Sequence, residues 1–226
     1  MEKKILAIIA ARAGSKGIKN KNFVKINKKY LIDYTIREAK KSKLINKIVI
    51  SSDSQKILQI AKKRKIEFIT RPKILSEDKT PIYPVIKHVL DLEKKKNLFY
   101  DYILLLQPTT PLKKAFMIEK SIKLIKKMKA DTLVSVYAAG DNHPSRMYKK
   151  KNGLLIPLNK KKQSSNRQNL EEIYHRDGNI YIFSTPSFIK NKSIYGKKII
   201  PLILEKKYKL NIDDKYDLAL ARKILN

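Results

Sequence analysis

A glycine-containing basic loop directly follows the first apolar run of the chain. The stretch IIAARAGSKGIKNKN, residues 8 to 22, passes from isoleucine and alanine into one arginine, two glycines and three lysines. Gly14 and Gly17 allow the backbone to curve around a phosphate so that its N–H groups point at the anion. Arg12 offers a forked set of donors, and the lysines add charge. The spacing fits neither a P-loop nor a dinucleotide fingerprint, so it predicts a nucleotide phosphate site of another fold, with a lysine-rich surface turn as the alternative.

A second polar set follows a buried run. The stretch LLLQPTTPL, residues 104 to 112, ends in Gln107 and continues into a proline-fixed turn that carries Thr109 and Thr110. An amide and two hydroxyls at the carboxyl end of a strand can hydrogen-bond a sugar. The alternative is an ordinary strand-to-helix turn with a threonine cap.

Acidic residues gather near the C-terminus in NIDDKYDL, residues 211 to 218. Asp213, at the end of an extended run, could hold a magnesium ion against triphosphate oxygens, and helix capping is the alternative. For Asp214 and Asp217 we expect capping and an exposed helix face.

Two further stretches, HPSRMYKK (143 to 150) and RQNLEEIYHRDGNIYIF (167 to 183), carry scattered cations. These cations are Arg146, Arg167, His175 and Arg176. They suit an anionic sugar acid that must lie beside an anionic nucleotide. The chain has three histidines without an i,i+4 pair, so a histidine metal site is not expected, and His88 is expected to be structural.

These residues lie at the ends of alternating strand and helix patterns. The periodicity predicts strands at 3–11, 46–52, 65–70, 100–107, 131–139, 179–184 and 197–204, and an extended run at 208–213. It predicts helices at 30–42, 54–64, 84–96, 114–128 and 214–225, the last capped by Asp213 or Asp214. Such alternation predicts an α/β fold with a mostly parallel sheet, and a site outside the carboxyl ends of its strands.

The alternation breaks between Gly140 and Ile173, where polar residues and short apolar pieces such as GLLIPL (153 to 158) replace long helices. We expect a hairpin or arm that packs against something, such as a second subunit. A chain of 226 residues is long enough for one α/β domain. We therefore expect a single domain over 1–226 with an excursion at about 140–172.

The formal charge of +32 could indicate nucleic acid, an acidic membrane or a polyanionic substrate. The excess is nearly all lysine and is spread along the chain. Because no arginine-rich helix, zinc-finger spacing or base-stacking signature is present, specific nucleic-acid binding is not expected. A lysine-rich nucleic-acid-binding module stays as the alternative from another class.

Other features bear on location. The chain has no cysteine, which excludes disulfides and thiolate metal sites. Its apolar runs are too short to span a membrane. Lys3 and Lys4 followed by ILAIIAA imitate a secretory signal, but the run leads straight into the strand and helix pattern. We expect a soluble, cytoplasmic protein.

In this order the motifs resemble those of the bacterial CMP-sugar synthetases that activate nonulosonic acids, the acylneuraminate cytidylyltransferases. The resemblance covers almost the whole chain and includes RPKILSEDKTPIYPVI (71 to 86), which resembles the second nucleotide segment of the family. It implies a Rossmann-like, three-layer, GT-A-like sheet with a small dimerisation arm. It further implies a homodimer that uses Mg²⁺ and transfers CMP from CTP to the anomeric hydroxyl of a nine-carbon sugar acid, releasing pyrophosphate.

The resemblance also implies residue roles. The catalytic set is Arg12, Lys16, Lys21 and Asp213, with Asp213 as the metal ligand. The nucleotide set is Arg12, Ala13, Gly14, Ser15, Lys16, Lys21, Asn22, Arg71 and Thr80. The sugar-acid set is Gln107, Arg146, Arg167, His175 and Arg176. No side chain is identified as the general base, a role that a metal-bound water or hydroxide could fill.

Two departures from the family pattern affect these roles. Relatives carry Asp-Ile-Asp where this chain has Asn211-Ile212-Asp213, which removes one anionic ligand. Relatives read Arg-x-Asn-Gly-Ala where this chain reads HRDGN from His175, so either His175 or Arg176 fills the arginine position.

A rival enzyme is the cytidylyltransferase for the eight-carbon acid of lipopolysaccharide. Its N-terminal loop typically carries further arginine and proline where this chain has Gly-Ser-Lys-Gly. Within the nonulosonic acids, the motifs favour a sialic or legionaminic acid over pseudaminic acid.

Overall fold

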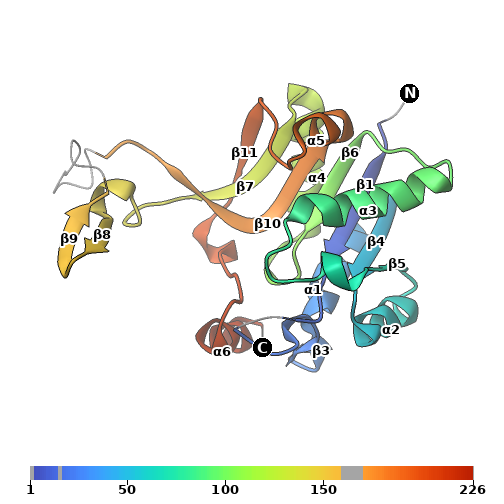
Figure 1. Cartoon of the computed structure of the whole chain (residues 1–226), viewed down its shortest axis with the longest axis horizontal. Coiled ribbons are helices and arrows are strands. Elements are labelled where there is room, and N and C mark those ends of the chain that lie inside the picture. Colours follow the sequence, from blue (N-terminus) through green and yellow to red (C-terminus); the bar gives the residue numbers. More distant parts are fainter. Residues whose placement is uncertain (1–2, 15–16, 159–169, 226) are drawn as a thin grey trace.

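A seven-stranded sheet with the strand order β11-β7-β10-β6-β1-β4-β5 forms the centre of the computed structural model, which describes residues 3–14, 17–158 and 170–225 (Figure 1). The strands are β1 (Ile5–Ala10), β4 (Lys47–Ser52), β5 (Glu67–Thr70), β6 (Tyr102–Leu106), β7 (Thr132–Ala138), β10 (Tyr174–Ser184) and β11 (Ile199–Ile203). Neighbouring strands are parallel except around β10, which is antiparallel to β6 and β7. The predicted mostly parallel sheet is confirmed.

Helices cover both faces of this sheet. They are α1 (Leu31–Lys41), α2 (Gln55–Lys63), α3 (Ile82–Lys95), α4 (Ala115–Met128) and α5 (Thr185–Asn191). The C-terminal helix α6 (Lys215–Ile224) packs off the sheet, in a separate cluster with Ile18, Ile26 and Tyr34. Alternate residues of β1 point to opposite faces: Ile5, Ala7 and Ile9 pack in one core cluster, while Leu6 and Ile8 pack in another. The first cluster includes residues of α1, α2 and α4, and the second includes residues of α3 and α5. The fold therefore has three layers, as expected.

The central strands β1 and β6 form where the sequence is apolar on both faces. Every residue of β6 is buried and no more than 3% exposed, which is why YILLL is an unbroken apolar run. Side chains cap some of the helix starts: the Ser54 side chain accepts from Ile57 N on α2, and Asp214 with Asp217 forms a capping box on α6. Of the two candidate caps, Asp214 is the observed one, which leaves Asp213 available to the loop before the helix.

The predicted strands and helices are confirmed with small shifts at their ends, apart from three differences. The extended run at 208–213 is no strand of the sheet, because a 3-10 helix (Lys206–Tyr208) and a loop occupy that region. β10 begins at Tyr174, earlier than the predicted start at 179, and its pairing register with β7 shifts between Arg176 and Tyr181. The sequence patterns also missed α5.

Smaller elements complete the chain. A hairpin of β2 (Lys25–Ile26) and β3 (Lys29–Tyr30) precedes α1, and single 3-10 turns occupy Lys21–Phe23, Lys73–Leu75 and Pro144–Arg146. No helix among the described residues is long and apolar enough to cross a membrane.

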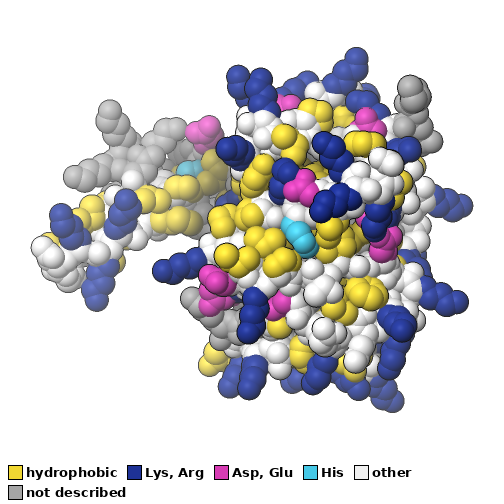
Figure 2. All heavy atoms as spheres, turned by 45° about the vertical axis from the view of Figure 1, so that its right-hand side comes forward, with side chains coloured by type: hydrophobic (Ala, Val, Ile, Leu, Met, Phe, Trp, Pro, Cys, Tyr) yellow, Lys and Arg dark blue, Asp and Glu magenta, His cyan; other side chains and the backbone are white. Residues whose placement is uncertain are grey.

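The predicted excursion contains a hairpin of β8 (Tyr148–Lys151) and β9 (Leu154–Pro157), which projects away from the sheet (Figure 1). Figure 2 shows hydrophobic side chains along this arm, and Tyr148, Leu154 and Leu155 are each at least half exposed. The hairpin is confirmed, and dimerisation through it stays a prediction.

Candidate functional site

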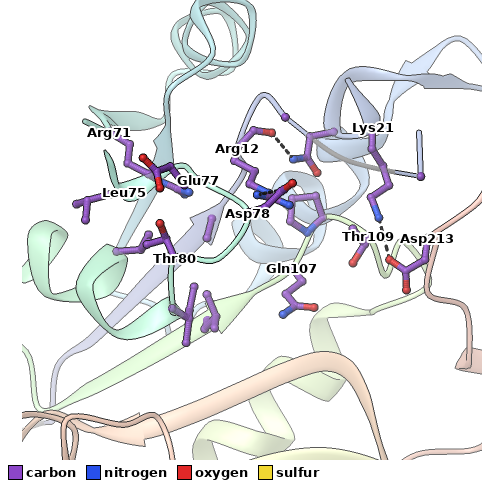
Figure 3. A pocket seen from close by; sticks show the side chains of 18 of the residues that line it. Arg12, Lys21, Arg71, Leu75, Glu77, Asp78, Thr80, Gln107, Thr109 and Asp213 are labelled. Carbon is purple, nitrogen blue, oxygen red and sulfur yellow. Dashed lines mark hydrogen bonds and ion pairs between the residues drawn. The ribbon is translucent and has the colours of Figure 1, made fainter. Parts of the chain in front are cut away.

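A cavity of about 590 Å³ lies at the carboxyl ends of β1, β5 and β6 (Figure 3). We call it the glycine-loop pocket. Its polar lining comes from four separate segments and comprises Arg12, Gly14, Gly17, Lys21, Asn22, Arg71, Glu77, Asp78, Thr80, Gln107, Thr109, Asn211 and Asp213. The sequence motifs around residues 12, 71, 107 and 213 therefore meet at one place, as the end-of-strand rule predicts.

Side-chain and backbone contacts fix the glycine loop at the end of β1. The Ala13 N–H donates to Asp53 Oδ1 at 2.8 Å, and Asn22 Nδ2 donates to the Arg12 carbonyl at 2.9 Å. Gly17 lies so close to the C-terminal motif that a Cβ built on it would stand 2.0 Å from the backbone oxygen of Asp213. The glycine at this position is required by that approach, since no side chain fits there.

Ion pairs join the cations of the pocket to its carboxylates. Arg12 Nη1 lies 2.6 Å from Asp78 Oδ1, and Lys21 Nζ lies 2.8 Å from Asp213 Oδ1. Asn211 Nδ2 donates to the other oxygen of Asp213. Figure 3 shows Arg12 beside Asp78 and Lys21 beside Asp213. The positive charge predicted for a phosphate is present, and each of these two cations already has an acidic partner.

Arg71 forms a buried wall of the same pocket. Its side chain donates to Ser51 Oγ at 3.1 Å and to the Ser51 carbonyl at 2.7 Å, which anchors it to the end of β4. Burial lowers its pKa to about 10, with a further lowering by Arg12, while Asp53 acts in the opposite direction. A pKa near 10 leaves the guanidinium charged at neutral pH, so Arg71 is a fixed cation.

The turn after β6 divides its polar groups between the pocket and the core. Gln107 and Thr109 line the pocket, whereas Thr110 is fully buried and its hydroxyl donates to the Gln107 carbonyl at 3.1 Å. The interpretation of Thr110 as a sugar contact is wrong, because a fully buried hydroxyl with a backbone partner stabilises the turn instead. Gly178 lies directly beside Gln107, since a Cβ added to it would stand 3.2 Å from Gln107 Oε1. Its backbone φ of +77° also favours glycine at this position.

A second cavity of about 1060 Å³ adjoins the first. We call it the tyrosine pocket, because its aromatic lining comprises Tyr83, Tyr137, Tyr174, Tyr181 and Tyr195. The two pockets share the lining residues Ile82, Leu105, Gln107, Asn211 and Asp213. A ligand in one can therefore meet a ligand in the other at Gln107 and Asp213.

The tyrosine pocket holds its cations against aromatic rings. The Arg176 guanidinium bonds the Tyr195 hydroxyl and lies 5.4 Å from the centre of that ring. The rings of His175 and Tyr137 are 5.2 Å apart, and Lys209 Nζ lies 4.3 Å from the centre of the Tyr137 ring. This combination of charge and ring faces suits an anionic ligand with an apolar side, such as a sugar acid.

The other residues named from the sequence line neither pocket or lie outside the described residues. Arg146 lies on the arm with its guanidinium 3.2 Å from Asp141, and it lines neither pocket of its own chain. Ala13 contributes its N–H to Asp53 and does not line the pockets. Ser15, Lys16 and Arg167 lie outside the described residues. His88 lies on α3 and lines neither of these two pockets, and its structural role stays a prediction.

The sequence patterns did not predict several residues of the site. They are Asp53, Glu77, Asp78, Lys209 and the five tyrosines. Asp53 follows β4 directly, so the same end-of-strand rule that found Gln107 could have found it. Asp78 and Lys209 lie in irregular segments, where no periodic signal marks them.

The described residues offer few side chains that could bind a metal ion. Among residues 3–14, 17–158 and 170–225, no three His, Asp or Glu side chains form a group that could hold an ion. Asp213, with the Asn211 amide beside it, is the carboxylate that both pockets share. One carboxylate suits Mg²⁺ only if phosphates and water complete its shell, as is usual for nucleotide-bound Mg²⁺.

Comparisons with known proteins agree with this geometry. A family described as cytidylyltransferase matches residues 6–224. The chain is 33% identical over 224 residues to the N-acylneuraminate cytidylyltransferase of Escherichia coli O18:K1:H7, covering 98% of this chain and 52% of that protein. It is 34% identical over 228 residues to the CMP-N,N'-diacetyllegionaminic acid synthase of Legionella pneumophila, covering 98% of this chain and 96% of that one. The chain thus spans about half of the first relative and nearly all of the second.

Solved structures share the fold. A CMP:2-keto-3-deoxy-manno-octonic acid synthetase complexed with CTP superposes with a TM-score of 0.73 over 98% of both chains, at 12% identity. At that identity the likeness is one of fold alone.

Proposed function

Because the chain belongs to the cytidylyltransferase family, we propose that it transfers CMP from CTP to the anomeric hydroxyl of a nonulosonic acid and releases pyrophosphate. The relatives named for N-acylneuraminate and for N,N'-diacetyllegionaminic acid support this substrate class. One observation carries the proposal: Arg12 and Lys21 of the glycine loop and Arg71 of the segment after β5 line one cavity that continues into a second cavity rich in tyrosine.

In this proposal CTP occupies the glycine-loop pocket. Arg12 and Lys21 bind the triphosphate, together with the loop N–H groups and with Ser15 and Lys16. Asn22, Arg71 and Thr80 lie nearer cytosine and ribose. In the described part of the chain, the buried Asn22 Oδ1 has no hydrogen-bond partner, so it can accept from a cytosine amino group or a ribose hydroxyl.

The sugar acid occupies the tyrosine pocket. Gln107, His175 and Arg176 are its proposed contacts there, and Arg146 and Arg167 stay predicted contacts. The hydroxyl of the sugar attacks the α-phosphorus in line with the departing pyrophosphate. The attack takes place near Gln107 and Asp213, because these residues border both cavities.

We propose that Asp213 holds the Mg²⁺ of the reaction. When bound, the ion neutralises charge on the phosphates and on the leaving pyrophosphate. The chain's own part is to bring Lys21 and Asp213 to the same wall, so that a cation and a carboxylate are both available to a triphosphate. No side chain is proposed as the general base.

A homodimer formed through the arm and a cytoplasmic location complete the proposal. The exposed apolar side chains of the hairpin, Tyr148, Leu154 and Leu155, support a partner surface of the same kind in a second copy. Gel filtration with light scattering tests this, and a clean monomer at micromolar concentration would contradict it.

Neither alternative is favoured by a specific observation. The relatives at 33% and 34% identity are named for nonulosonic acids, whereas the likeness to the octonic acid synthetase is at 12% identity. For the nucleic-acid-binding module, Figure 2 shows lysine and arginine spread over the visible face rather than gathered in one patch. Such spread charge raises non-specific attraction to any polyanion.

The deciding test is pyrophosphate release with CTP, Mg²⁺ and, in turn, N-acetylneuraminic, legionaminic, pseudaminic and the eight-carbon lipopolysaccharide acid. Release with a sialic or legionaminic acid is expected. Release with the eight-carbon acid alone would select the rival enzyme. A thermal shift with CTP but no turnover would remove the sugar-acid part of the proposal, and salt-sensitive duplex retention without CTP selectivity would favour the module.

A further inference from the structure

Lys113 is completely buried, which is unusual for lysine. Its side-chain nitrogen lies 2.7 Å from the Gln107 carbonyl, 2.5 Å from the Thr110 carbonyl, 2.8 Å from Thr110 Oγ1 and 3.1 Å from Thr35 Oγ1. All four partners are uncharged oxygens. Every N–H group that this nitrogen carries therefore has an oxygen to bond.

Three of these four oxygens belong to the turn between β6 and α4. The same turn carries Gln107, Pro108 and Thr109, which line the glycine-loop pocket. Lys113 itself lines neither pocket. Lys113 therefore bonds the backbone of the turn from the core side, while Gln107 and Thr109 line the cavity on the other side.

The same turn also contacts two other segments that line the pockets. The Thr109 carbonyl accepts from the Ile212 N–H at 2.8 Å, one residue before Asp213. The Thr110 hydroxyl lies 3.4 Å from the Gly178 carbonyl, in the strand that carries His175 and Arg176. Thr35, the fourth acceptor, belongs to α1 on the opposite side. The Lys113 nitrogen therefore bonds a turn that itself contacts both the Asp213 segment and β10.

We infer that Lys113 is a positioning residue of the proposed reaction: it fixes the turn that carries Gln107 and, through the Thr109–Ile212 bond, sets the place of Asp213 relative to the glycine loop. The inference rests on the proposed function for its kinetic consequence, but the structural coupling stands independently of it. Arg12, Lys21 and Arg71 come from other segments and do not bond Lys113, so binding of CTP alone should depend on it little.

The test compares Lys113→Met, which keeps the length and loses every donor, with Lys113→Arg, which keeps donors and charge. Lys120→Met, on the exposed face of the helix α4 that follows the turn, is the matched control. Circular dichroism confirms folding of each variant. We expect Lys113→Met to bind CTP within about threefold of the wild type while kcat with the sugar acid falls by about tenfold or more, since a misplacement of about 1 Å can cost on the order of 100-fold. Lys113→Arg should recover part of the loss, and Lys120→Met should show none.

Amide hydrogen exchange supplies a readout that needs no turnover. The Ile212 N–H should exchange faster in Lys113→Met than in the wild type, while amides of the distant strand β5 stay unchanged. If Lys113→Met does not fold, Thr35→Val removes one of the four bonds and should produce a smaller change in the same direction.

Two outcomes would overturn the inference. One is unchanged Ile212 exchange together with wild-type kcat. The other is an equal loss of CTP affinity, kcat and melting temperature, which would mark Lys113 as a general packing residue. Failure of the proposed function looks different, because the wild type would then show no turnover with any acid while the exchange result still stands.

Discussion

Lys21 Nζ and Asp213 Oδ1 are 2.8 Å apart, so the cation proposed for the triphosphate and the carboxylate proposed for the metal ion bond each other. The Lys21 side chain is 12% exposed and that of Asp213 is 65% exposed. Solvent therefore reaches the Asp213 carboxylate much more than the Lys21 ammonium group. Binding of a metal-bound triphosphate would exchange this one contact for two, Lys21 with phosphate and Asp213 with the ion.

Replacement of Asp213 by asparagine should therefore separate the two roles. Even neighbours of a metal ligand cost about 10-fold to 100-fold in metal affinity when mutated, so loss of the ligand should raise the Mg²⁺ requirement by at least about tenfold. CTP binding without Mg²⁺ should not weaken, because Lys21 loses its competing carboxylate. A magnesium titration of pyrophosphate release measures the first effect, with Asp91→Asn on α3 as the control. Near-normal turnover of Asp213→Asn in limiting Mg²⁺ would refute the assignment.

The Arg12–Asp78 pair leads to a prediction of opposite sign. Removal of the Asp78 charge should release Arg12 for the triphosphate and strengthen CTP binding. Both side chains are partly exposed, 32% for Arg12 and 41% for Asp78, so the pair contributes only about 0.2–1 kcal/mol, or up to about fivefold in affinity. Calorimetry of CTP binding to Asp78→Asn measures it.

Glu77→Gln, in the same pocket, is the control for the Asp78 effect. An equal gain in both variants would mean that general charge, rather than the pair with Arg12, sets the affinity. Weaker binding in Asp78→Asn would mean that Asp78 itself orders the site.

The two glycines of the basic loop should respond differently to alanine. Gly17→Ala places a Cβ 2.0 Å from the Asp213 backbone oxygen, so the loop or the C-terminal segment must move. Such overpacking typically costs about 1–3 kcal/mol in the free energy of unfolding, and the displaced loop should lower kcat/KM by about tenfold or more. Gly14→Ala meets nothing within 4 Å and should leave the stability of the free protein unchanged. Equal unfolding midpoints for the two variants would contradict the close approach of Gly17 to Asp213.

The free energy of unfolding should depend on pH because of Lys113. Burial lowers the pKa of Lys113 from 10.5 to about 7 in the folded protein, and the carboxylate of Asp177 acts in the opposite direction. Between pH 7 and 10.5 the unfolded chain then binds the proton that the folded chain lacks, so stability rises with pH through this window. Arginine stays charged in both states. Urea unfolding at pH 7, 8 and 9 should show the advantage of the wild type over Lys113→Arg growing with pH, whereas a constant difference would mean that the amine keeps its proton.

A stability effect without a functional effect is expected at Glu93. This carboxylate is fully buried and bonds Lys47 at 2.6 Å, Lys96 at 3.1 Å and the Tyr100 hydroxyl at 2.9 Å. It lines neither described pocket. Glu93→Leu removes this carboxylate, while Lys47 and Lys96 keep Glu67 as a partner, and should destabilise by about 1–3 kcal/mol. The KM for CTP should not change, and an altered KM would indicate that the network reaches the site.

Much of the fold could be predicted because its signals are local. A strand covered on both faces has no room for polar residues, so β1 and β6 are recognisable as unbroken apolar runs. The site followed from the same patterns, since Arg12, Arg71 and Gln107 each come just after a strand end and parallel strands bring such ends to one edge.

The features that escaped prediction depend on contacts between distant segments. Lys113 follows a turn in a lysine-rich chain, and nothing local distinguishes it from the exposed lysines of α4. Asp78 gains its role only when the segment after β5 folds over Arg12. The run at 208–213 alternates like a strand, yet Tyr208 ends a 3-10 helix and residues 209–213 form a loop in which the Ile212 N–H bonds the Thr109 carbonyl of the turn after β6.

The edge of the sheet at β11 has a consequence for self-association. In the part of the chain that the structure describes, β11 pairs with β7 alone, and its Ile199 and Ile203 are about half exposed. An apolar edge strand of this kind can template amyloid-like growth. Pro201 stands at the middle of β11, and because proline has no N–H, its nitrogen must face the open side. An incoming strand would find a missing donor at the centre of the edge. Pro201 therefore acts as a gatekeeper against aggregation on the side of the sheet remote from the glycine loop.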